Sequence, residues 1–464
     1  MAPKGQRPRG HGPDDQRNAL AAKIAPLRDR RSGRRGNLSE GENIILTYRR
    51  NFILVFCFLV FFQGDVFGQS NETKLLEYSY SGAGKPGTSG QEFLKVMAHH
   101  EVQKVLLEVA SEPRTAAFLE DRLKGTDVTS ETLQTLRLIR RDQGAYVLAF
   151  SLFTNTDLNK IRSVAEVEGR SLAAALLVRR AEIENILARN PQPGVEGKAR
   201  AFIILGYASL DNDGLNLVKK RGYLAVPEKG TYLPSASQIG GGGSLRGIYW
   251  GSHSAHEMIS VTSFGDHYSV PRIALPDIFF SLESSLGQME APESLKSKFC
   301  TAVYALVRRR AGMIMLALRE GEKNVKQLAE ASSLTEAETK KLLDLLLELQ
   351  YVSGANDLYR SVIPIFDERD EPMVRDLRRL GQEVMVNWLD GHYKALSQHL
   401  SDLSPRRYGV PLSEGFYDIW HYIFGIANRE LVAEGLFADP YDDKRLFKGF
   451  IPAVYLLGVL QGPI

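Results

Sequence analysis

Apolar residues recur at helical spacing along most of the chain after residue 93. In the segment 100–110, Val102, Val105 and Val109 fall on one face of a helix, because side chains three to four positions apart share a face. Residues 146–153 are instead rich in strand-forming types. The pattern in the first half of the chain predicts helices over 100–110, from Pro113 and from Thr129, a strand over 146–153, and a long helix over about 157–188.

The same order of elements recurs in the second half of the chain. Thr335 and Glu338 have the Thr-x-x-Glu spacing of a capping box, in which each side chain accepts a hydrogen bond from the other residue's backbone N–H. The strand expected over 359–366 equals the one over 146–153 in length, and both begin with Tyr and end with Phe. The remaining predicted elements are helices over 311–318 and 325–329, a strand–turn–strand segment over 351–366, and a long helix over about 371–400.

This order of helices and strands resembles the winged helix-turn-helix superfamily of bacterial repressors. The resemblance is best in residues 311–366, around Val325-Lys-Gln-Leu-Ala-Glu-Ala-Ser-Ser-Leu-Thr-Glu-Ala-Glu-Thr-Lys-Lys-Leu-Leu-Asp-Leu-Leu346, and weaker in residues 97–153. Helix spacing and capping carry it. The resemblance implies three helices followed by a β-wing, and it implies DNA binding. Ordinary α-hairpins beside a small sheet are the alternative.

We therefore expect a mainly α fold with small β-wings (α+β), made of two tandem winged-helix-like units related by duplication. Each unit is followed by a helical or irregular segment, and the two segments share a Gly-x-x-Ala pattern, at 222–225 and 435–438, typical of helix ends. The expected segments are a disordered basic leader over 1–45, a signal peptide or anchor over 46–68, a linker over 69–92, the first unit over 93–190, a connecting segment over 198–290, the second unit over 298–400 and a helical C-terminal segment over 405–464.

The leader ends in a pattern typical of a secretory signal peptide. Arg49 and Arg50 precede an uninterrupted apolar run over 52–62, and Gly68 offers a small residue at which cleavage can occur. A membrane span needs about 20 apolar residues, so this run is short for one. Because positive charge stays inside, we expect residues 69–464 to be exported, to the periplasm or the cell exterior.

Other interpretations of this segment stay open. The run over 52–62 can remain as an uncleaved membrane anchor, can belong to a twin-arginine signal, or can form a buried core element. The region before the run is long for a signal peptide, which favours the hypothesis that translation starts near Leu46.

The distribution of charge changes how the basic composition is understood. The chain has 58 Lys and Arg against 55 Asp and Glu. Residues 1–68 carry a net charge of +6, whereas residues 69–464 carry −3. The basic character therefore belongs to the leader and favours export over nucleic-acid binding. The chain has two cysteines, which excludes a disulfide scaffold and a thiolate zinc site.

Nucleic-acid binding depends on the third helix of each unit, because phosphates are met by Lys and Arg. In the second unit this helix presents Glu336, Glu338, Lys340, Lys341, Asp344 and Glu348, so that acids outnumber bases. In the first unit the candidate nucleic-acid contacts are Arg137, Arg140 and Arg141. Nucleic acid is therefore the second choice of partner.

A dense polar cluster lies between residues 250 and 268. Its candidate metal ligands are His253, His256, Asp266 and His267, residue types that hold zinc or another divalent ion. Surface or hydrogen-bonded histidines are the alternative. The segment 211–214 resembles a calcium loop, but Lys220 stands where a bidentate Glu is needed, so a turn is expected there. The motifs of serine and cysteine nucleophiles that we sought do not occur, and no cofactor beyond a divalent metal is considered.

These patterns predict an exported, non-catalytic binding or scaffold protein of unknown ligand. The expected partner is another protein or a second copy of the chain, contacted through the long helices. Membrane contact is expected only through residues 52–62, if they are retained. A DNA-binding transcriptional regulator and a metal-dependent enzyme centred on the histidine cluster are the alternatives. The aromatic segment 419–424 is interpreted as core, with a surface for a partner as the alternative.

Overall fold

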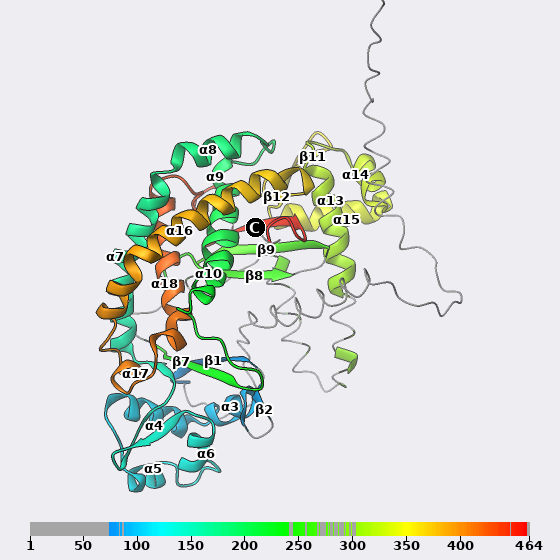
Figure 1. The fold of residues 1–464 in the computed structure, drawn as a ribbon. Helices are drawn as coiled ribbons and strands as arrows, with labels where there is room; N and C mark the ends of the chain where they lie inside the picture. The colour runs from blue at the N-terminus through cyan, green and yellow to red at the C-terminus, as the bar shows by residue number, and fades with distance from the viewer. Residues whose placement is uncertain are drawn as a thin grey trace, which may run out of the picture. The chain divides into compact units, whose positions relative to one another are not determined.

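The computed structural model describes residues 74–82, 84–85, 88–240, 245–255, 258–266, 269, scattered positions between 275 and 298, 303–445 and 447–461. The expected leader (1–45) and signal segment (46–68) lie outside the described residues. The chain divides into residues 1–60 and 61–464, and all of the described residues lie in the second part. Its fold is mixed α+β and mainly helical, as predicted (Figure 1). None of its described helices is long and apolar enough to cross a bilayer.

The N-terminal module (residues 76–148) has a hydrophobic core of its own. Phe93, Leu106 and Leu133 are fully buried in this core, which also includes Tyr232 from a strand far along the chain. The module consists of β1 (Leu76–Gly82), β2 (Gly84–Lys85), β3 (Thr88–Ser89), α3 (Gly90–Met97), α4 (His100–Ser111), α5 (Ala116–Arg122), α6 (Ser130–Thr135), β4 (Ile139–Asp142) and β5 (Ala145–Leu148). A group of short helices therefore packs beside a small hairpin.

The prediction of a linker over 69–92 is wrong for its described part. Strand β1 pairs antiparallel with β7 (Tyr232–Gln238), and α3 already begins at Gly90. The segment is rich in Ser and Gly, but every second residue faces the core. Tyr78 and Tyr80 pack against it, and both rings are edge-on to Phe93. A period of two is the signal of a half-buried strand.

The strand predicted over 146–153 is in fact two strands that belong to different sheets. Strand β5 pairs with β4 across a turn at Gln143 and Gly144, both of which have positive φ. Strand β6 (Ser151–Phe153) leaves this hairpin and pairs in parallel with β7, which gives a sheet of order β1-β7-β6. Strand β5 has a local hairpin partner, but β6 pairs with β7, more than 80 residues later, which the local pattern does not specify.

The helical body (residues 155–220 and 371–433) forms the largest core. Helix α7 packs on α18, and α16 packs on both η2 and α7 (Figure 1). The long helix predicted over 157–188 is interrupted near Val178, between α7 and α8. The elements are α7 (Asn155–Leu177), α8 (Arg180–Ala188), α9 (Gly197–Ala201), η2 (Phe202–Asp213), α10 (Gly214–Lys220), η4 (Glu368–Asp370), α16 (Glu371–His399), α17 (Ser404–Arg407) and α18 (Leu412–Ala433).

Two glycines allow the long helices to approach their partners closely. A methyl group on Gly169 of α7 would lie 2.7 Å from the carbonyl oxygen of Ile423 in α18, and one on Gly381 of α16 would collide with Ser209 of η2. The apolar faces of both long helices are therefore covered within the chain. The aromatic segment 419–424 of α18 is buried, as its interpretation as core requires. Contact between copies through these helices stays a prediction.

The turn expected at 211–214 is wrong, because these residues continue a helix. Nearly every residue of η2, which has π-type hydrogen bonding, is buried, and η2 runs directly into α10. The guanidinium of Arg378 in α16 donates to both carboxylate oxygens of Asp213, at 2.9 and 2.7 Å. The indole of Trp420 in α18 donates to the Leu210 carbonyl at 3.0 Å. These tertiary contacts outweigh the turn preference of Asp, Asn and Gly.

The second module (residues 309–361) has the predicted order of helices, but the strand expected over 359–366 is two strands of different sheets, β11 (Leu358–Ser361) and β12 (Ile365–Phe366). Its third helix opens with the predicted capping box: Thr335 Oγ1 accepts from the Glu338 N–H at 3.2 Å, and Glu338 Oε2 accepts from the Thr335 N–H at 3.0 Å. The module consists of α13 (Arg309–Leu318), α14 (Val325–Ser332), α15 (Glu336–Glu348), β10 (Val352–Ala355) and β11 (Leu358–Ser361), and η3 (Tyr304–Arg308) precedes it.

A second sheet contains strands from three separate parts of the chain. Strand β12 (Ile365–Phe366) pairs in parallel with β13 (Phe450–Leu456), which pairs antiparallel with β9 (Ile259–Gly265). Strand β8 (Gly251–Ala255) completes the order β12-β13-β9-β8. The connecting segment over 198–290 and the C-terminal segment over 405–464 therefore contain strands as well as the predicted helices.

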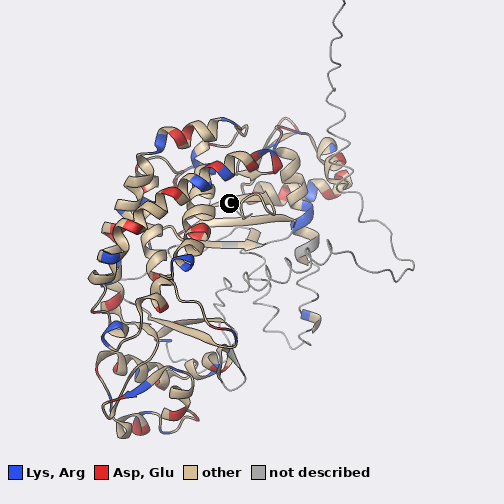
Figure 2. Ribbon diagram, viewed as in Figure 1, with Lys and Arg blue, Asp and Glu red and all other residues tan. Residues whose placement is uncertain are grey.

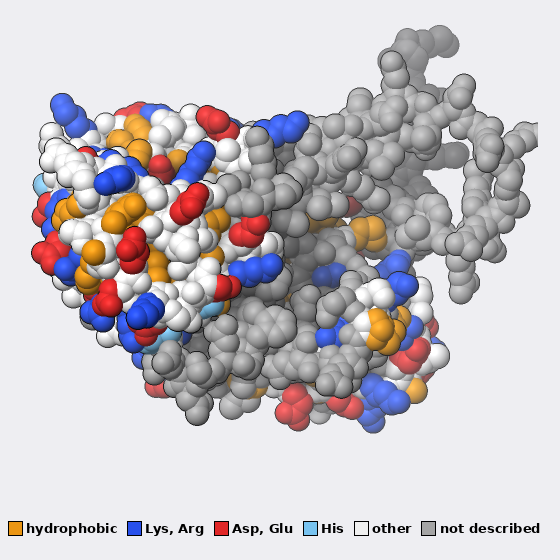
Figure 3. Space-filling model, turned by 90° about the horizontal axis from the view of Figure 1, so that it is seen from below, with side chains coloured by type: hydrophobic (Ala, Val, Ile, Leu, Met, Phe, Trp, Pro, Cys, Tyr) orange, Lys and Arg blue, Asp and Glu red, His pale blue; other side chains and the backbone are white. Residues whose placement is uncertain are grey.

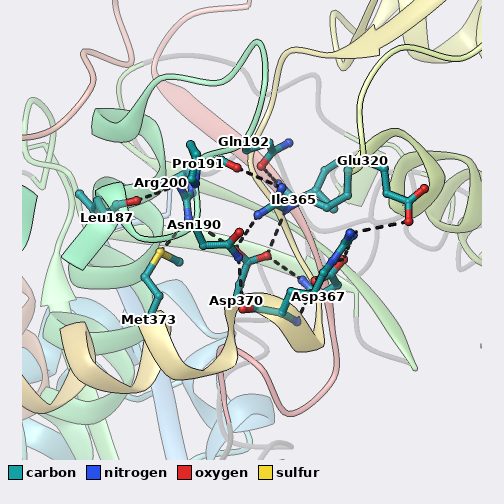
Figure 4. A network of polar contacts seen from close by, with 12 residues as sticks. Leu187, Asn190, Pro191, Gln192, Arg200, Glu320, Ile365, Asp367, Asp370 and Met373 are labelled. Atoms are coloured by element: carbon teal, nitrogen blue, oxygen red, sulfur yellow. Dashed lines mark hydrogen bonds and ion pairs between the residues drawn. The ribbon is translucent and has the colours of Figure 1, made fainter. Parts of the chain in front are cut away.

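A buried ion-pair network joins the second module to the helical body (Figure 4). The Asp370 side chain, where η4 leads into α16, is fully buried, and its Oδ1 accepts from Arg319 at 2.9 Å, Asn190 at 2.8 Å and Arg200 at 3.4 Å. Arg319 ends α13, and Arg200 lies in α9. Burial lowers the pKa of Arg200 to about 10, against the opposing attraction of Asp370. Two guanidinium groups thus share one buried carboxylate.

Candidate functional site: a groove in the N-terminal module

An open groove of about 460 Å³ lies between α3 and α6. Its volume falls within the range of roughly 300–1,000 Å³ that small-ligand sites occupy. The floor is apolar, made by Val96, Val128 and Leu136. The walls carry three carboxylates, one lysine, one histidine and three threonines, so the groove offers both apolar contact and hydrogen-bonding groups.

Both walls of the groove are held by the core beneath them. In α3, the Phe93 ring contacts the rings of Tyr78 and Tyr232, each at a centroid distance of 6.0 Å. Helix α6 begins with a capping box in which Thr129 Oγ1 accepts from the Thr132 N–H at 3.1 Å and Thr132 Oγ1 accepts from the Thr129 N–H at 3.3 Å. The groove is therefore formed by anchored elements.

The charge of the groove is negative. Glu92, Asp127 and Glu131 face it with Lys95 as the single lysine, and His99 Nε2 lies 3.2 Å from Asp127 Oδ1. The Asp127 carboxylate is 84% exposed, so it stays available to a ligand as well as to His99. A cationic group with an aliphatic stem, such as a Lys or Arg side chain, matches both the acidic walls and the apolar floor.

The arginines predicted as nucleic-acid contacts lie after α6, and all three are exposed. Arg137 follows the helix in a left-handed conformation, with φ of 56°. Arg140 in β4 donates to the Tyr408 carbonyl at 2.6 Å and pairs with Asp142 at 3.4 Å, so its guanidinium is engaged. Arg141 stands opposite Tyr146 in the hairpin. The three arginines lie within one short segment that includes the start of β4. Their contact with nucleic acid stays a prediction.

The third helix of the second module, α15, also presents acidic residues to solvent. Its exposed residues include Glu336, Asp344 and Glu348, and Glu338 pairs with Arg310 at 3.2 Å. Acidic and basic residues alternate along the described helices (Figure 2). On the described part of the face in Figure 3 they are likewise interspersed. Phosphate binding favours basic residues gathered on one face, which neither view shows.

The structure describes only part of the predicted metal cluster. His256 and His267 lie outside the described residues, and His253 lies in β8, opposite Ser263 of β9. Asp266 is buried, and its carboxylate accepts hydrogen bonds from the Gly247 N–H at 3.1 Å, the Ser269 N–H at 3.2 Å and the Tyr441 hydroxyl at 2.7 Å. The residues that the structure describes contain no group of three or more metal-ligand types. Metal binding stays a prediction.

The groove is the feature that sequence reasoning missed. One wall of it comes from α3, which begins inside the segment interpreted as a linker. The single available signal was the strand alternation of β1, which places α3 within the folded part. Comparison with protein-family models, with curated proteins and with solved structures found no match. The function is therefore argued from the geometry of this chain.

Proposed function

We propose that the chain is an exported, non-catalytic binding protein whose N-terminal groove holds a basic peptide segment of a partner. The observation that carries the proposal is the groove between α3 and α6, where three carboxylates and one lysine stand over an apolar floor. Lys and Arg side chains place aliphatic stems on apolar surface and their charges against carboxylates. A basic peptide segment therefore contacts the apolar floor with its aliphatic stems and the acidic walls with its charges.

The proposed architecture is a pair of duplicated winged-helix-like units. In the N-terminal module, helices α4, α5 and α6 and the hairpin β4–β5 come in the same order as α13, α14 and α15 and the hairpin β10–β11 of the second module. Backbone positions with positive φ also recur at one spacing of 213 residues: Arg137 and Gln350 after the third helix, and Gly222 and Gly435 after α10 and α18. In addition, β6 and β12 leave the two hairpins and join β7 and β13 in parallel, and these pair antiparallel with β1 and β9. These equivalent features support the proposed duplication.

The winged-helix resemblance also implies DNA binding, which we place second. Duplex DNA presents a dense row of negative phosphates, so a recognition helix bordered by acids repels it. In the N-terminal module the third helix borders the acidic groove, and in the second module it exposes an excess of acids. The same negative charge favours a basic protein partner.

A metal-dependent enzyme ranks third. Of its four candidate ligands, Asp266 is the one whose side chain the structure describes, and that carboxylate already accepts three hydrogen bonds from protein groups. Recruiting it for a metal would break contacts that hold Gly247 and Tyr441 in place. Asp266 therefore has a structural role that explains its burial without a metal.

The binding experiment uses fluorescein-labelled hexalysine and the purified chain in an anisotropy titration. We expect saturable binding that weakens as salt is raised, because the contacts are exposed ion pairs. The double variant Glu92→Gln, Glu131→Gln should weaken binding by about tenfold, since each exposed pair contributes up to about 1 kcal/mol. The matched control is Glu184→Gln on α8, an exposed glutamate outside the groove.

Three outcomes would contradict the proposal. Equal binding by wild type and the double variant would show that hexalysine binds elsewhere. Preferential, salt-sensitive binding of a labelled DNA duplex would favour the regulator. Recovery of a C-terminally tagged chain in the cytoplasmic fraction would remove the export part of the proposal and leave the groove to be judged by the titration.

A further inference from the structure

Helices α7 and α16 bring a serine, a histidine and a glutamate into line. Glu168 and Ser171 lie three residues apart on α7, so they share a face of the helix. On α16, His392 Nδ1 lies 2.7 Å from Glu168 Oε2, and its Nε2 lies 3.4 Å from Ser171 Oγ. The two ring nitrogens thus contact a carboxylate on one side and a hydroxyl on the other.

A tryptophan determines the direction of the hydrogen bonds. Trp388 Nε1, one helical turn before His392, lies 3.2 Å from Ser171 Oγ. An indole nitrogen can only donate, so Ser171 accepts from it and keeps its own hydrogen for another acceptor. In the tautomer whose Nδ1–H donates to Glu168, His392 Nε2 is that acceptor. The indole therefore donates to the hydroxyl, the hydroxyl donates to the imidazole, and the imidazole donates to the carboxylate.

Burial gives the three groups different environments. The Glu168 side chain is 8% exposed and the His392 side chain 38%. The Trp388 ring is buried and stacks on the His392 ring at 4.9 Å and 14°, which fixes the imidazole plane. The carboxylate is therefore shielded and the imidazole oriented, while Ser171, at the helix surface, is half-buried.

We propose that Ser171 is an activated nucleophile that attacks small, reactive acyl and phosphonyl compounds. His392 Nε2 takes the hydroxyl proton as Ser171 Oγ attacks, and Glu168 stabilises the imidazolium, as in serine hydrolases. With a fluorophosphonate, the Oγ–P bond forms, the P–F bond breaks, fluoride departs and the proton stays on His392. With an ester, the acyl–oxygen bond breaks and His392 returns the proton to the leaving oxygen.

The helical position of Ser171 limits the rate. Backbone N–H groups inside a helix donate to carbonyls one turn earlier, so α7 supplies no backbone oxyanion donors beside this hydroxyl. The Trp388 indole already donates to the attacking Ser171 Oγ, so it does not act as an oxyanion donor for the substrate. Loss of one oxyanion donor slows acyl transfer by about 100-fold or more, so slow stoichiometric modification is expected instead of rapid turnover. The site is separate from the groove and goes beyond the proposed binding function.

The test is labelling of the full chain with a fluorophosphonate probe, followed by intact-mass measurement and peptide mapping. We expect one adduct, on Ser171, and none at this position in Ser171→Ala. Glu168→Gln and His392→Gln should each slow labelling, the histidine variant by about 100-fold, because general-base assistance is lost. The matched control is Ser163→Ala, which changes an exposed serine of the same helix and should leave the rate unchanged.

Absence of an adduct at Ser171 after prolonged exposure overturns the proposal, and so does labelling of His392→Gln at the wild-type rate. Either result would mean that Glu168, Ser171 and His392 have only a structural role, in holding α7 against α16. If His392→Gln fails to fold, as judged by circular dichroism, the nearly isosteric Glu168→Gln decides. An unchanged labelling rate in Glu168→Gln then contradicts the proposed role of Glu168 in stabilising the imidazolium.

Discussion

The buried carboxylate of Asp370 gives a strong test of how the second module is held. In Asp370→Asn the side chain keeps its size but loses its charge, so the guanidinium groups of Arg200 and Arg319 remain buried without a counter-charge. Their side chains are only 2% and 5% exposed, so water cannot replace the lost partner. Removing one member of a buried ion pair costs about 3–5 kcal/mol. Against a total stability of roughly 5–15 kcal/mol, this change should be large.

The assay is urea unfolding at neutral pH, followed by tryptophan fluorescence and by circular dichroism. The matched control is Asp376→Asn in α16, the helix that follows Asp370; its carboxylate accepts from Arg189 at 2.8 Å but is 30% exposed. Exposed pairs contribute about 0–1 kcal/mol, so the control should change little. Hydrogen exchange should also speed up at the end of α13, where Arg319 lies.

A double-mutant cycle refines the result. Adding Arg200→Met to Asp370→Asn removes one of the two stranded charges and should recover part of the lost stability, because groups in one network couple by about 0.5–3 kcal/mol. If Asp370→Asn costs under about 1 kcal/mol, or no more than Asp376→Asn, then water reaches the network and the reasoning from burial is refuted.

Three further expectations concern other parts of the chain. Gly169→Ala should lower the unfolding free energy by about 1–3 kcal/mol because its methyl group meets the α18 backbone, whereas Gly391→Ala, in open space on α16, should be neutral or stabilising in the same denaturation assay. Thr335→Ala should cost about 1 kcal/mol through loss of the α15 cap, and Thr335→Ser should restore most of it. Burial, with a smaller effect of the Glu77 charge, raises the pKa of Asp418 to about 7. Since the folded state then disfavours the ionised form, wild type should lose stability relative to Asp418→Asn as pH rises from about 4 to 7, and a pH-independent difference in urea midpoints would contradict this.

The features that could be predicted from sequence are those whose cause is local. The capping box of Thr335 and Glu338 involves residues three positions apart, and the structure contains both of its hydrogen bonds. Gly222 and Gly435 have the positive φ that a glycine after a helix end suggests. The order of helices and hairpins follows from hydrophobic periodicity, which is likewise local.

The features that could not be predicted depend on residues far apart in the chain. Ser171 and His392 are separated by 221 positions, and no spacing rule relates them. At Asp213 the local preference for a turn is overridden by Arg378, 165 positions later. Composition misled at 76–82, where Ser and Gly lie on a strand whose partner, β7, is more than 150 residues away. The groove could not be predicted for the same reason, because α3 begins at Gly90, only a few residues after β1 ends at Gly82.

The packing of α7 on α18 has a consequence for the order of assembly during synthesis. The apolar face of α7 is complete at Leu177, but the helix that covers it ends at Ala433. At about 5–20 residues per second, a ribosome needs roughly 10–50 s to make the intervening chain. The core of the helical body therefore closes only after the last helix has left the ribosome. Throughout that interval a chaperone can bind the uncovered face of α7, and α18 must displace it once that helix has been made.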